Sequence, residues 1–341
     1  MTKIIWGARR IITVLSLVVF VSIILNIVLI YINAKGNNSN TNSKGVSESK
    51  LKTIEGINSI RLNSFNFCKP LLLVNIPSEA EKLNPLKEKA MEFIKKEIAL
   101  KNITTASVYL KTLKDGSWME INQDEQYYPA SMYKIAVLIA FLKTAESNTS
   151  LLSEKIKFTI PQTSQRDNRN TGNFLEVGKF YTYKDLLYRM IVYSDNESAN
   201  LLMLKTGREE LKKLSDYLQI PGEAGALGFQ INVVNMSKYL RILYNGTYLS
   251  PENSEYALTL LSESKYEDGI ARNMDKSIQL VHKFGERNMD TDPQLHETAI
   301  IYLKDNPILL TIMTKGNDYK KLSREIAELS KLILVEAMQM N

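Results

Sequence analysis

The sequence predicts an α+β domain in which one antiparallel sheet is flanked by helices and interrupted by an inserted all-helical subdomain. Two observations lead to this fold class. Strand-like apolar runs occur as a pair near position 110 and as a set of three after position 277, and they do not alternate regularly with helices. Between these sets, apolar residues repeat with helical spacing over a long central block. The 341 residues, 44% apolar and 23% charged, have a globular composition.

The first element in chain order is an apolar segment, Ile11–Ile32, which contains 22 residues and no charge. A helix of that length spans the hydrocarbon core of a bilayer. The segment exceeds the usual apolar region of a signal peptide, and no clear cleavage site follows it, so we favour a retained anchor over a cleaved signal. Because Lys3, Arg9 and Arg10 precede it, we expect a single-pass protein of the cell membrane, with 1–10 in the cytoplasm and the chain after residue 33 outside.

A flexible tether is predicted over 33–66, because its first part is rich in Asn, Ser, Gly and Lys. The globular domain then covers 67–341. Residues 1–50 contain six Lys and Arg but one acidic residue, and they hold five units of the net charge of +6. The nearly neutral remainder argues against a nucleic-acid partner. The single cysteine, Cys68, excludes an intrachain disulfide and is interpreted as a small buried residue.

The domain begins with a predicted helix over 86–100. Two strands follow, over 105–110 and 118–121, and a turn at 114–116 joins them. The remaining elements are helices over 135–142, 183–192, 197–205, 209–218, 236–244 and 252–262, strands over 277–283, 298–303 and 308–313, and a closing helix over 319–338.

The pattern Ser-x-x-Lys occurs four times, and one occurrence has the context that serine catalysis needs. A serine and a lysine three residues apart on a helix share one face, and a desolvated lysine beside other cations can act as a base. Ser131 and Lys134 open the strongly apolar segment 135–142, which would bury the lysine. The alternative is that Ser131 only caps this helix. The other pairs are less suitably placed: Ser47 with Lys50, Ser49 with Lys52, and Ser262 with Lys265.

A second motif, Ser194–Asp195–Asn196, follows the predicted helix 183–192. Alone it would be a polar turn in which Asp195 or Asn196 caps the next helix. Together with Ser131-x-x-Lys134 it resembles the first two motifs of the penicillin-recognising serine enzymes, the class A β-lactamase superfamily that includes penicillin-binding proteins. The resemblance covers roughly 67–341 and implies the αβα sandwich of that family.

The third motif of that family is Lys-Thr-Gly on a strand that lines the cleft. The literal Lys205–Thr206–Gly207 ends a predicted helix, where Gly207 would be a C-terminal cap, so we reject it. Lys283–Phe284–Gly285 follows strand-like residues and precedes two further strands. We therefore expect it to form the opposite wall of the site.

The resemblance implies a role for each matching residue. Ser131 would attack an amide carbonyl, and Lys134 would take its proton. Ser194 would pass a proton to the leaving nitrogen. Asn196 would bind the side-chain amide of the substrate and steady Lys134. Lys283 would attract the substrate carboxylate and lower the pKa of Lys134 by like charge.

The third motif would also line the substrate through Phe284, Gly285 and Glu286. The oxyanion hole would consist of the backbone N–H groups of Ser131 and Glu286. Phe284 departs from the family, because it replaces a hydroxyl residue that usually touches the substrate carboxylate.

A further departure concerns deacylation. The Glu-x-x-Leu-Asn loop, whose glutamate activates the deacylating water in class A β-lactamases, is missing between the second and third motifs. The acid in the corresponding stretch is Glu223, which is either a deacylating base or a turn residue. Without such a base the acyl-enzyme would persist, as in a penicillin-binding protein.

The resulting hypothesis is a membrane-anchored extracytoplasmic serine hydrolase of β-lactamase type, acylated on Ser131 by β-lactams or by D-Ala-D-Ala-like amides of peptidoglycan peptides. One alternative is a penicillin-binding or peptidase-like enzyme with slow deacylation. Another is a non-catalytic binding module that keeps the fold. No cofactor or metal is implied, because His282 and His296 lack metal-ligand spacing and are interpreted as structural.

Overall fold

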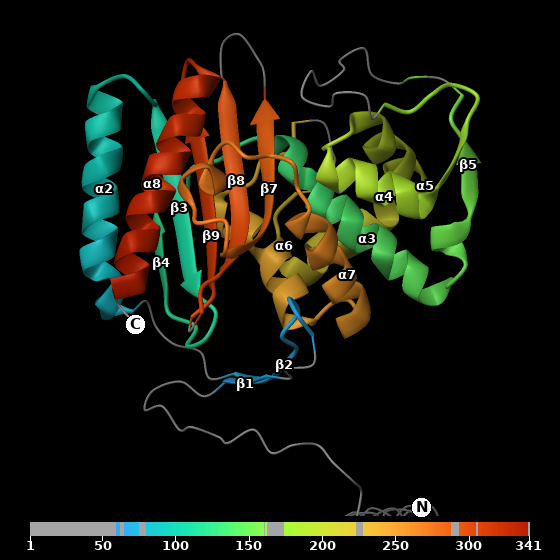
Figure 1. Ribbon diagram of the computed structural model, residues 1–341, viewed down its shortest axis with the longest axis horizontal. Coiled ribbons are helices and arrows are strands. Elements are labelled where there is room, and N and C mark those ends of the chain that lie inside the picture. Colours follow the sequence, from blue (N-terminus) through green and yellow to red (C-terminus); the bar gives the residue numbers. More distant parts are fainter. Residues whose placement is uncertain are drawn as a thin grey trace, which may run out of the picture. The chain divides into compact units, whose positions relative to one another are not determined.

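The computed structural model of the protein describes residues 59–61, 65–74, 80–159, 161, 174–222, 228–287, 293–304 and 306–339 (Figure 1). Three predicted segments lie wholly or mostly outside these residues: the cytoplasmic end, 1–10, the anchor, 11–32, and most of the tether, 33–66. Within the ranges given, no helix combines the length and the apolarity that are needed to cross a membrane.

A five-stranded antiparallel sheet forms the centre of the domain, with the strand order β4-β3-β9-β8-β7. The predicted pair and the predicted set of three strands thus join one sheet. Strand β7 lies at one edge of the sheet and pairs antiparallel with β8, the next strand in the chain. The bounds are Thr105–Thr112 for β3, Trp118–Ile121 for β4, Gln279–Arg287 for β7, Gln294–Tyr302 for β8 and Ile308–Lys315 for β9.

Two helices cover one face of this sheet, α2 (Asn84–Ala99) and α8 (Tyr319–Gln339) (Figure 1). They confirm the helices predicted over 86–100 and 319–338. Their apolar stripes, which include Leu86 on α2 and Ile326 on α8, are buried with residues from the sheet in one core. Helical periodicity marks such stripes in the sequence, because one face of each helix meets the sheet.

Helices α3 to α7 form the helical subdomain on the other side of the sheet (Figure 1). Their bounds are Lys134–Ser147 for α3, Tyr183–Val192 for α4, Asn196–Leu218 for α5, Val233–Asn245 for α6 and Pro251–Ser262 for α7. The side chains of 135–142 on α3 are all fully buried, so α3 is the central helix of this subdomain. Helix α4 begins with a capping box in which Thr182 and Asp185 exchange hydrogen bonds.

Helix α5 is interrupted at Gly207, whose φ of 77° and ψ of 162° lie outside the helical range. It therefore consists of the two helices predicted over 197–205 and 209–218. The literal Lys205–Thr206–Gly207 sequence lies in this helical region and contributes no strand to the sheet.

Among the described residues, two short ribbons and four 3-10 helices were not predicted, because such short pieces carry no clear periodicity. The equally short strand β4 was predicted with the help of the turn that joins it to β3. One ribbon pairs β5 (Lys155–Lys157) with β6 (Phe180–Thr182). The other pairs β1 (Ser59–Arg61) with β2 (Leu71–Val74), so strand pairing starts within the range predicted as tether. The 3-10 helices are η1 (Glu81–Leu83), η2 (Ala130–Tyr133), η3 (Leu151–Ser153) and η4 (Ile270–Asn273).

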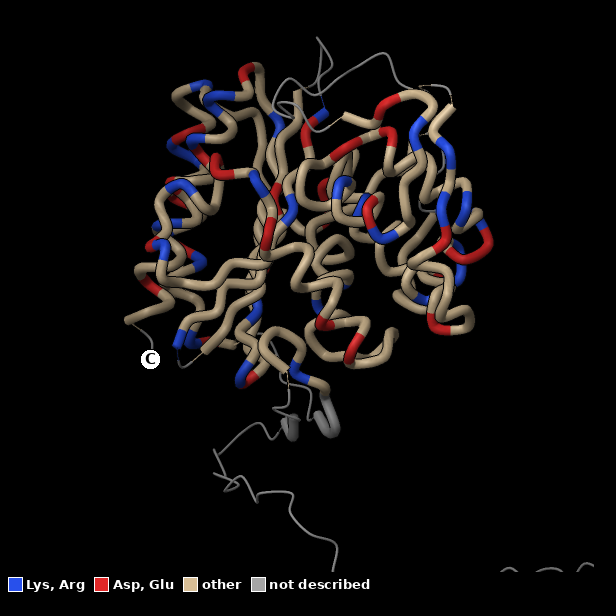
Figure 2. Tube along the Cα trace, turned by 45° about the vertical axis from the view of Figure 1, so that its right-hand side comes forward, with Lys and Arg blue, Asp and Glu red and all other residues tan. Residues whose placement is uncertain are grey.

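The segment that enters the domain is held by one carboxylate on α7. Glu255 accepts hydrogen bonds from the backbone N–H groups of Asn66, Phe67 and Cys68 at 2.6 to 3.1 Å. Cys68 is buried, as predicted. Over the described part of the domain, Lys and Arg are interspersed with Asp and Glu (Figure 2), which agrees with the nearly neutral charge balance of this part of the sequence.

Candidate active site

The candidate nucleophile Ser131 lies in η2, a 3-10 turn that leads directly into α3. Neither helix has a side-chain cap, and their N-cap residues are Pro129 and Tyr133, so the reading of Ser131 as a helix cap is wrong. The preceding residue, Ala130, has a φ of 48°, in the left-handed region that residues other than glycine rarely adopt. Such strained residues cluster at active sites, where the surrounding packing holds them.

Lys134 opens α3 one turn after Ser131 and is buried. Its ammonium group donates hydrogen bonds to the Ser194 carbonyl oxygen, to Ser194 Oγ at 3.1 Å and to Asn196 Oδ1 at 2.7 Å. The apolar residues 135–142 fix α3 in the core, so they also fix the position of this lysine. The first two motifs are thus in direct contact.

Ser194 lies in the connection between α4 and α5 and has a φ of 57°. Asp195 is the N-cap of α5, and its carboxylate accepts the backbone N–H of Ser198 at 2.7 Å. The predicted capping role of Asp195 is therefore correct. Because Asp195 holds the helix start, Ser194 and Asn196 on either side of it are both directed at Lys134.

Lys283 reaches the same hydroxyl from the sheet. It lies on β7, is fully buried, and donates hydrogen bonds to Ser194 Oγ at 2.9 Å and to the Phe284 carbonyl oxygen at 3.0 Å. The Ser194 hydroxyl therefore bridges the side chains of Lys134 and Lys283. Two cations that share one hydroxyl repel each other, and loss of a proton from one of them relieves this repulsion.

Gly285 brings β7 into close contact with η2. A Cβ atom at this position would lie 2.4 Å from the Pro129 carbonyl oxygen and 2.9 Å from the Met132 backbone nitrogen. Only a residue without a side chain fits there. The strand backbone at Gly285 consequently lies against η2, the turn that contains Ser131.

Phe284 is buried and stacks on Tyr266, with ring centroids 4.0 Å apart and an interplanar angle of 18°. The centroid of the Phe284 ring also lies 4.1 Å from Lys283 Nζ. The aromatic ring thus contacts the ammonium group of Lys283. His282 precedes Lys283 on β7, and its Nδ1 lies 2.6 Å from a carboxylate oxygen of the buried Glu297. This contact agrees with a structural role for His282.

The structure thus brings Lys134, Ser194, Asn196 and Lys283 into direct contact. Ser131 lies one turn before Lys134, in the turn against which Gly285 packs. Glu223, the candidate deacylating base, lies outside the described residues. Sequence reasoning missed Tyr266, because it belongs to no motif and lies in a loop before η4. The stacking of Phe284 on a second ring could not be inferred without the fold.

Comparison with known proteins identifies the family of the chain. A family model described as the β-lactamase enzyme family matches residues 89–337, so the chain belongs to that family, which is one of serine hydrolases. The fold is similar to that of PBP-A, with a TM-score of 0.66, 17% sequence identity, and coverage of 78% of this chain and 100% of PBP-A.

Two β-lactamases are comparably similar. For the enzyme from Sphaerobacter thermophilus the TM-score is 0.65 and the identity 17%, over 74% of this chain and 97% of that protein. For an ancestral class A β-lactamase the TM-score is 0.63 and the identity 20%, over 74% and 99%. These similarities show that the fold is shared.

Proposed function

We propose that the protein forms an acyl-enzyme on Ser131 with β-lactams or with D-Ala-D-Ala-like amides of cell-wall peptides. The observation that carries this proposal is the Ser194 hydroxyl, which contacts Lys134 at 3.1 Å and Lys283 at 2.9 Å. This arrangement places a hydroxyl that can relay a proton between two lysines, one of which, Lys134, lies one turn after Ser131 on the chain.

In the proposed reaction, Ser131 Oγ forms a bond to the carbonyl carbon while Lys134 accepts its proton. The carbonyl oxygen becomes an oxyanion that the backbone N–H groups of Ser131 and Glu286 stabilise. When the oxyanion collapses, the carbon–nitrogen bond breaks, and a proton passes through Ser194 to the leaving nitrogen. Asn196 and Lys283 hold Lys134 and Ser194 in place during these steps.

A second candidate function concerns the fate of the acyl-enzyme. The sequence lacks the Glu-x-x-Leu-Asn loop, which favours slow deacylation and hence a penicillin-binding enzyme. A variant of PBP-A, which shares the fold, has been solved as an acyl-enzyme complex with penicillin G. Glu223 is the alternative base that would make turnover efficient.

The proposed location is the outer face of the cell membrane, with Ile11–Ile32 as the anchor and 33–66 as the tether. The length and apolarity of Ile11–Ile32 support this placement, as do the basic residues that precede it. The substrate would then be a peptidoglycan peptide or a small β-lactam.

Intact-mass spectrometry of the full-length protein in detergent, mixed with penicillin, tests the proposed function. We expect an added mass equal to one penicillin, which is absent from Ser131→Ala and retained in the matched control Ser150→Ala. A persistent adduct supports a penicillin-binding enzyme, and a transient adduct with continuous hydrolysis supports a β-lactamase. If neither an adduct nor hydrolysis is observed, the proposal is refuted and the non-catalytic binding module remains.

A further inference from the structure

We propose that His296 and Gln294 on β8 are positioning residues, which fix the backbone of Tyr128 and thereby the location of the nucleophile Ser131. The inference rests on the proposed function. It assigns a part in acylation to two residues that belong to none of the three motifs.

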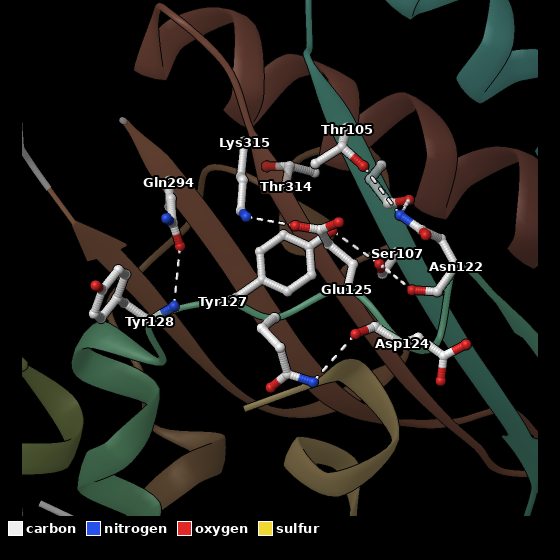
Figure 3. Close-up of polar contacts among 12 residues, drawn as sticks. Thr105, Ser107, Asn122, Asp124, Glu125, Tyr127, Tyr128, Gln294, Thr314 and Lys315 are labelled. Carbon is white, nitrogen blue, oxygen red and sulfur yellow. Dashed lines mark hydrogen bonds and ion pairs between the residues drawn. The ribbon is translucent and has the colours of Figure 1, made fainter. Parts of the chain in front are cut away.

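Both polar groups of the Tyr128 backbone are held by side chains from β8. The N–H of Tyr128 donates to Gln294 Oε1 at 3.1 Å (Figure 3), and the carbonyl oxygen of Tyr128 lies 3.1 Å from His296 Nε2. Gln294 is 1% exposed and His296 is fully buried, so water does not compete for these bonds. The two residues are two positions apart on a strand and therefore point to the same face.

The protonation of His296 follows from its second contact. The backbone N–H of Thr314 on β9 donates to His296 Nδ1 at 3.1 Å. A neutral imidazole has one donor and one acceptor nitrogen, so Nε2 carries the hydrogen and donates it to Tyr128. Burial lowers the pKa of His296 to about 3, which keeps the ring neutral in this tautomer at physiological pH. The sheet thus orients a donor toward the Tyr128 carbonyl.

The residue before Tyr128 is fixed as well. Tyr127 exchanges two backbone hydrogen bonds with Ile231, at 3.0 and 2.8 Å, and its hydroxyl lies 2.8 Å from Ser107 Oγ (Figure 3). Its ring meets the His296 ring edge-on, with centroids 5.2 Å apart. These contacts therefore hold Tyr127 against the sheet, just before the chain enters η2.

Between Tyr128 and Ser131 the chain has little freedom. The ring of Pro129 restricts its own φ, and its carbonyl oxygen lies against Gly285. Ala130 is held in the left-handed region. A displacement of Tyr128 is consequently transmitted to Ser131, and a displacement of about 1 Å at a reacting atom can cost about 100-fold in rate.

A merely structural role would require His296 only to accept the Thr314 N–H within the sheet. Two substitutions separate this from positioning, because each preserves one of the two contacts. His296→Gln places an amide N–H near the position of Nε2, and His296→Asn places an amide oxygen near the position of Nδ1. Gln294→Met removes the acceptor for the Tyr128 N–H at similar volume.

The experiment measures the rate of labelling of the full-length protein in detergent by fluorescent penicillin, over a range of concentrations, together with thermal unfolding. We expect His296→Asn to slow the limiting acylation rate about 10- to 100-fold, with the half-saturating concentration unchanged within twofold and the unfolding temperature near that of the wild type. His296→Gln should stay within threefold of the wild-type rate, and Gln294→Met should lose about 10-fold.

A folded His296→Asn that is labelled at the wild-type rate would overturn the proposal, and so would equal rate losses in the Asn and Gln variants. If His296→Asn does not fold, the rate of Gln294→Met decides. A wild type that penicillin does not label refutes the proposed substrate instead, and the same variants are then compared by their rate of reaction with a fluorophosphonate that modifies Ser131.

Discussion

The ammonium group of Lys283 lies 2.9 Å from the hydroxyl of Ser194, although the two residues come from different layers of the domain. Lys283 belongs to the edge strand β7, and Ser194 belongs to the connection between α4 and α5 in the helical subdomain. This hydrogen bond closes the site across the boundary between sheet and helices. Both partners are buried, so the contact depends on the packing of both layers.

Removal of this ammonium group should abolish most of the acylation. In Lys283→Met the Ser194 hydroxyl loses a donor that orients it, and we expect acylation by penicillin to slow about 100-fold or more, which is the usual size of a proton-transfer contribution. The rate is measured from the amount of fluorescent penicillin that is bound after a series of reaction times. Lys212→Met on the exposed face of α5 is the control, and wild-type labelling of Lys283→Met would contradict the assigned contact.

Gly285→Ala should destabilise the protein and slow acylation together. The new methyl group would overlap the Pro129 carbonyl oxygen, and relieving the overlap would separate β7 from η2. We expect a loss of about 1–3 kcal/mol in the free energy of unfolding, measured in urea, as for other overpacked sites.

Gly178→Ala is the matched control for that variant, because a Cβ atom there meets nothing within 4 Å while its φ of 90° still penalises alanine. It should cost about 1 kcal/mol without slowing acylation. If both variants acylate at the same rate, the close approach at Gly285 does not position the site.

The buried His296 should make the protein less stable in mild acid. Burial lowers its pKa to about 3, so the unfolded chain, with a pKa near 6.5, binds the proton more tightly than the folded protein. This contribution to stability is complete above about pH 6.5 and is lost as the pH falls toward 3. Between pH 7 and pH 5 we expect the wild type to lose about 2 kcal/mol more than His296→Gln.

Urea unfolding of both proteins at the two pH values measures this difference. Equal losses in the wild type and in His296→Gln would show that His296 is accessible to protons in the folded state, which the contacts with Tyr128 and Thr314 do not allow.

Glu255→Gln should weaken the contact between the segment 66–68 and helix α7, and so lower the stability of the domain. The carboxylate accepts N–H groups from three consecutive residues, whereas a carboxamide offers one oxygen and turns an N–H group toward the other donors. We expect a loss of about 1–3 kcal/mol in the free energy of unfolding. Glu252→Gln, at an exposed position of the same helix, should leave stability within about 0.5 kcal/mol, and equal effects would contradict the role of Glu255.

Most of the elements that the sequence predicted have several turns or a long apolar run. The α3 segment 135–142 and the helix pair interrupted at Gly207 are visible because burial imposes periodicity over many residues. Lys283 was assigned to the site because Lys283–Phe284–Gly285 follows strand-like residues and comes third in the order of motifs along the chain. The structure now shows its contact with Ser194.

The parts that sequence reasoning missed depend on contacts between distant segments. Gln294 and His296 meet Tyr128 only because the sheet places β8 beside η2, and a lone glutamine or histidine in a strand gives no sign of its partner. Tyr266 was missed for the same reason. The 3-10 turn at η2 was expected to be part of a helix, since a serine, a lysine and an apolar run do not distinguish the two kinds of turn.

The contact between Gly285 and the Pro129 carbonyl oxygen also constrains how this enzyme can be redesigned. A side chain fits at position 285 only if the backbone of 129–132 moves away from it, and that movement displaces Ser131. A library that randomises position 285 alone should therefore return glycine among its active members. Variants with a side chain at position 285 would have to come from libraries in which 129–132 and 285 vary together. In directed evolution these two segments should therefore be mutated as a pair.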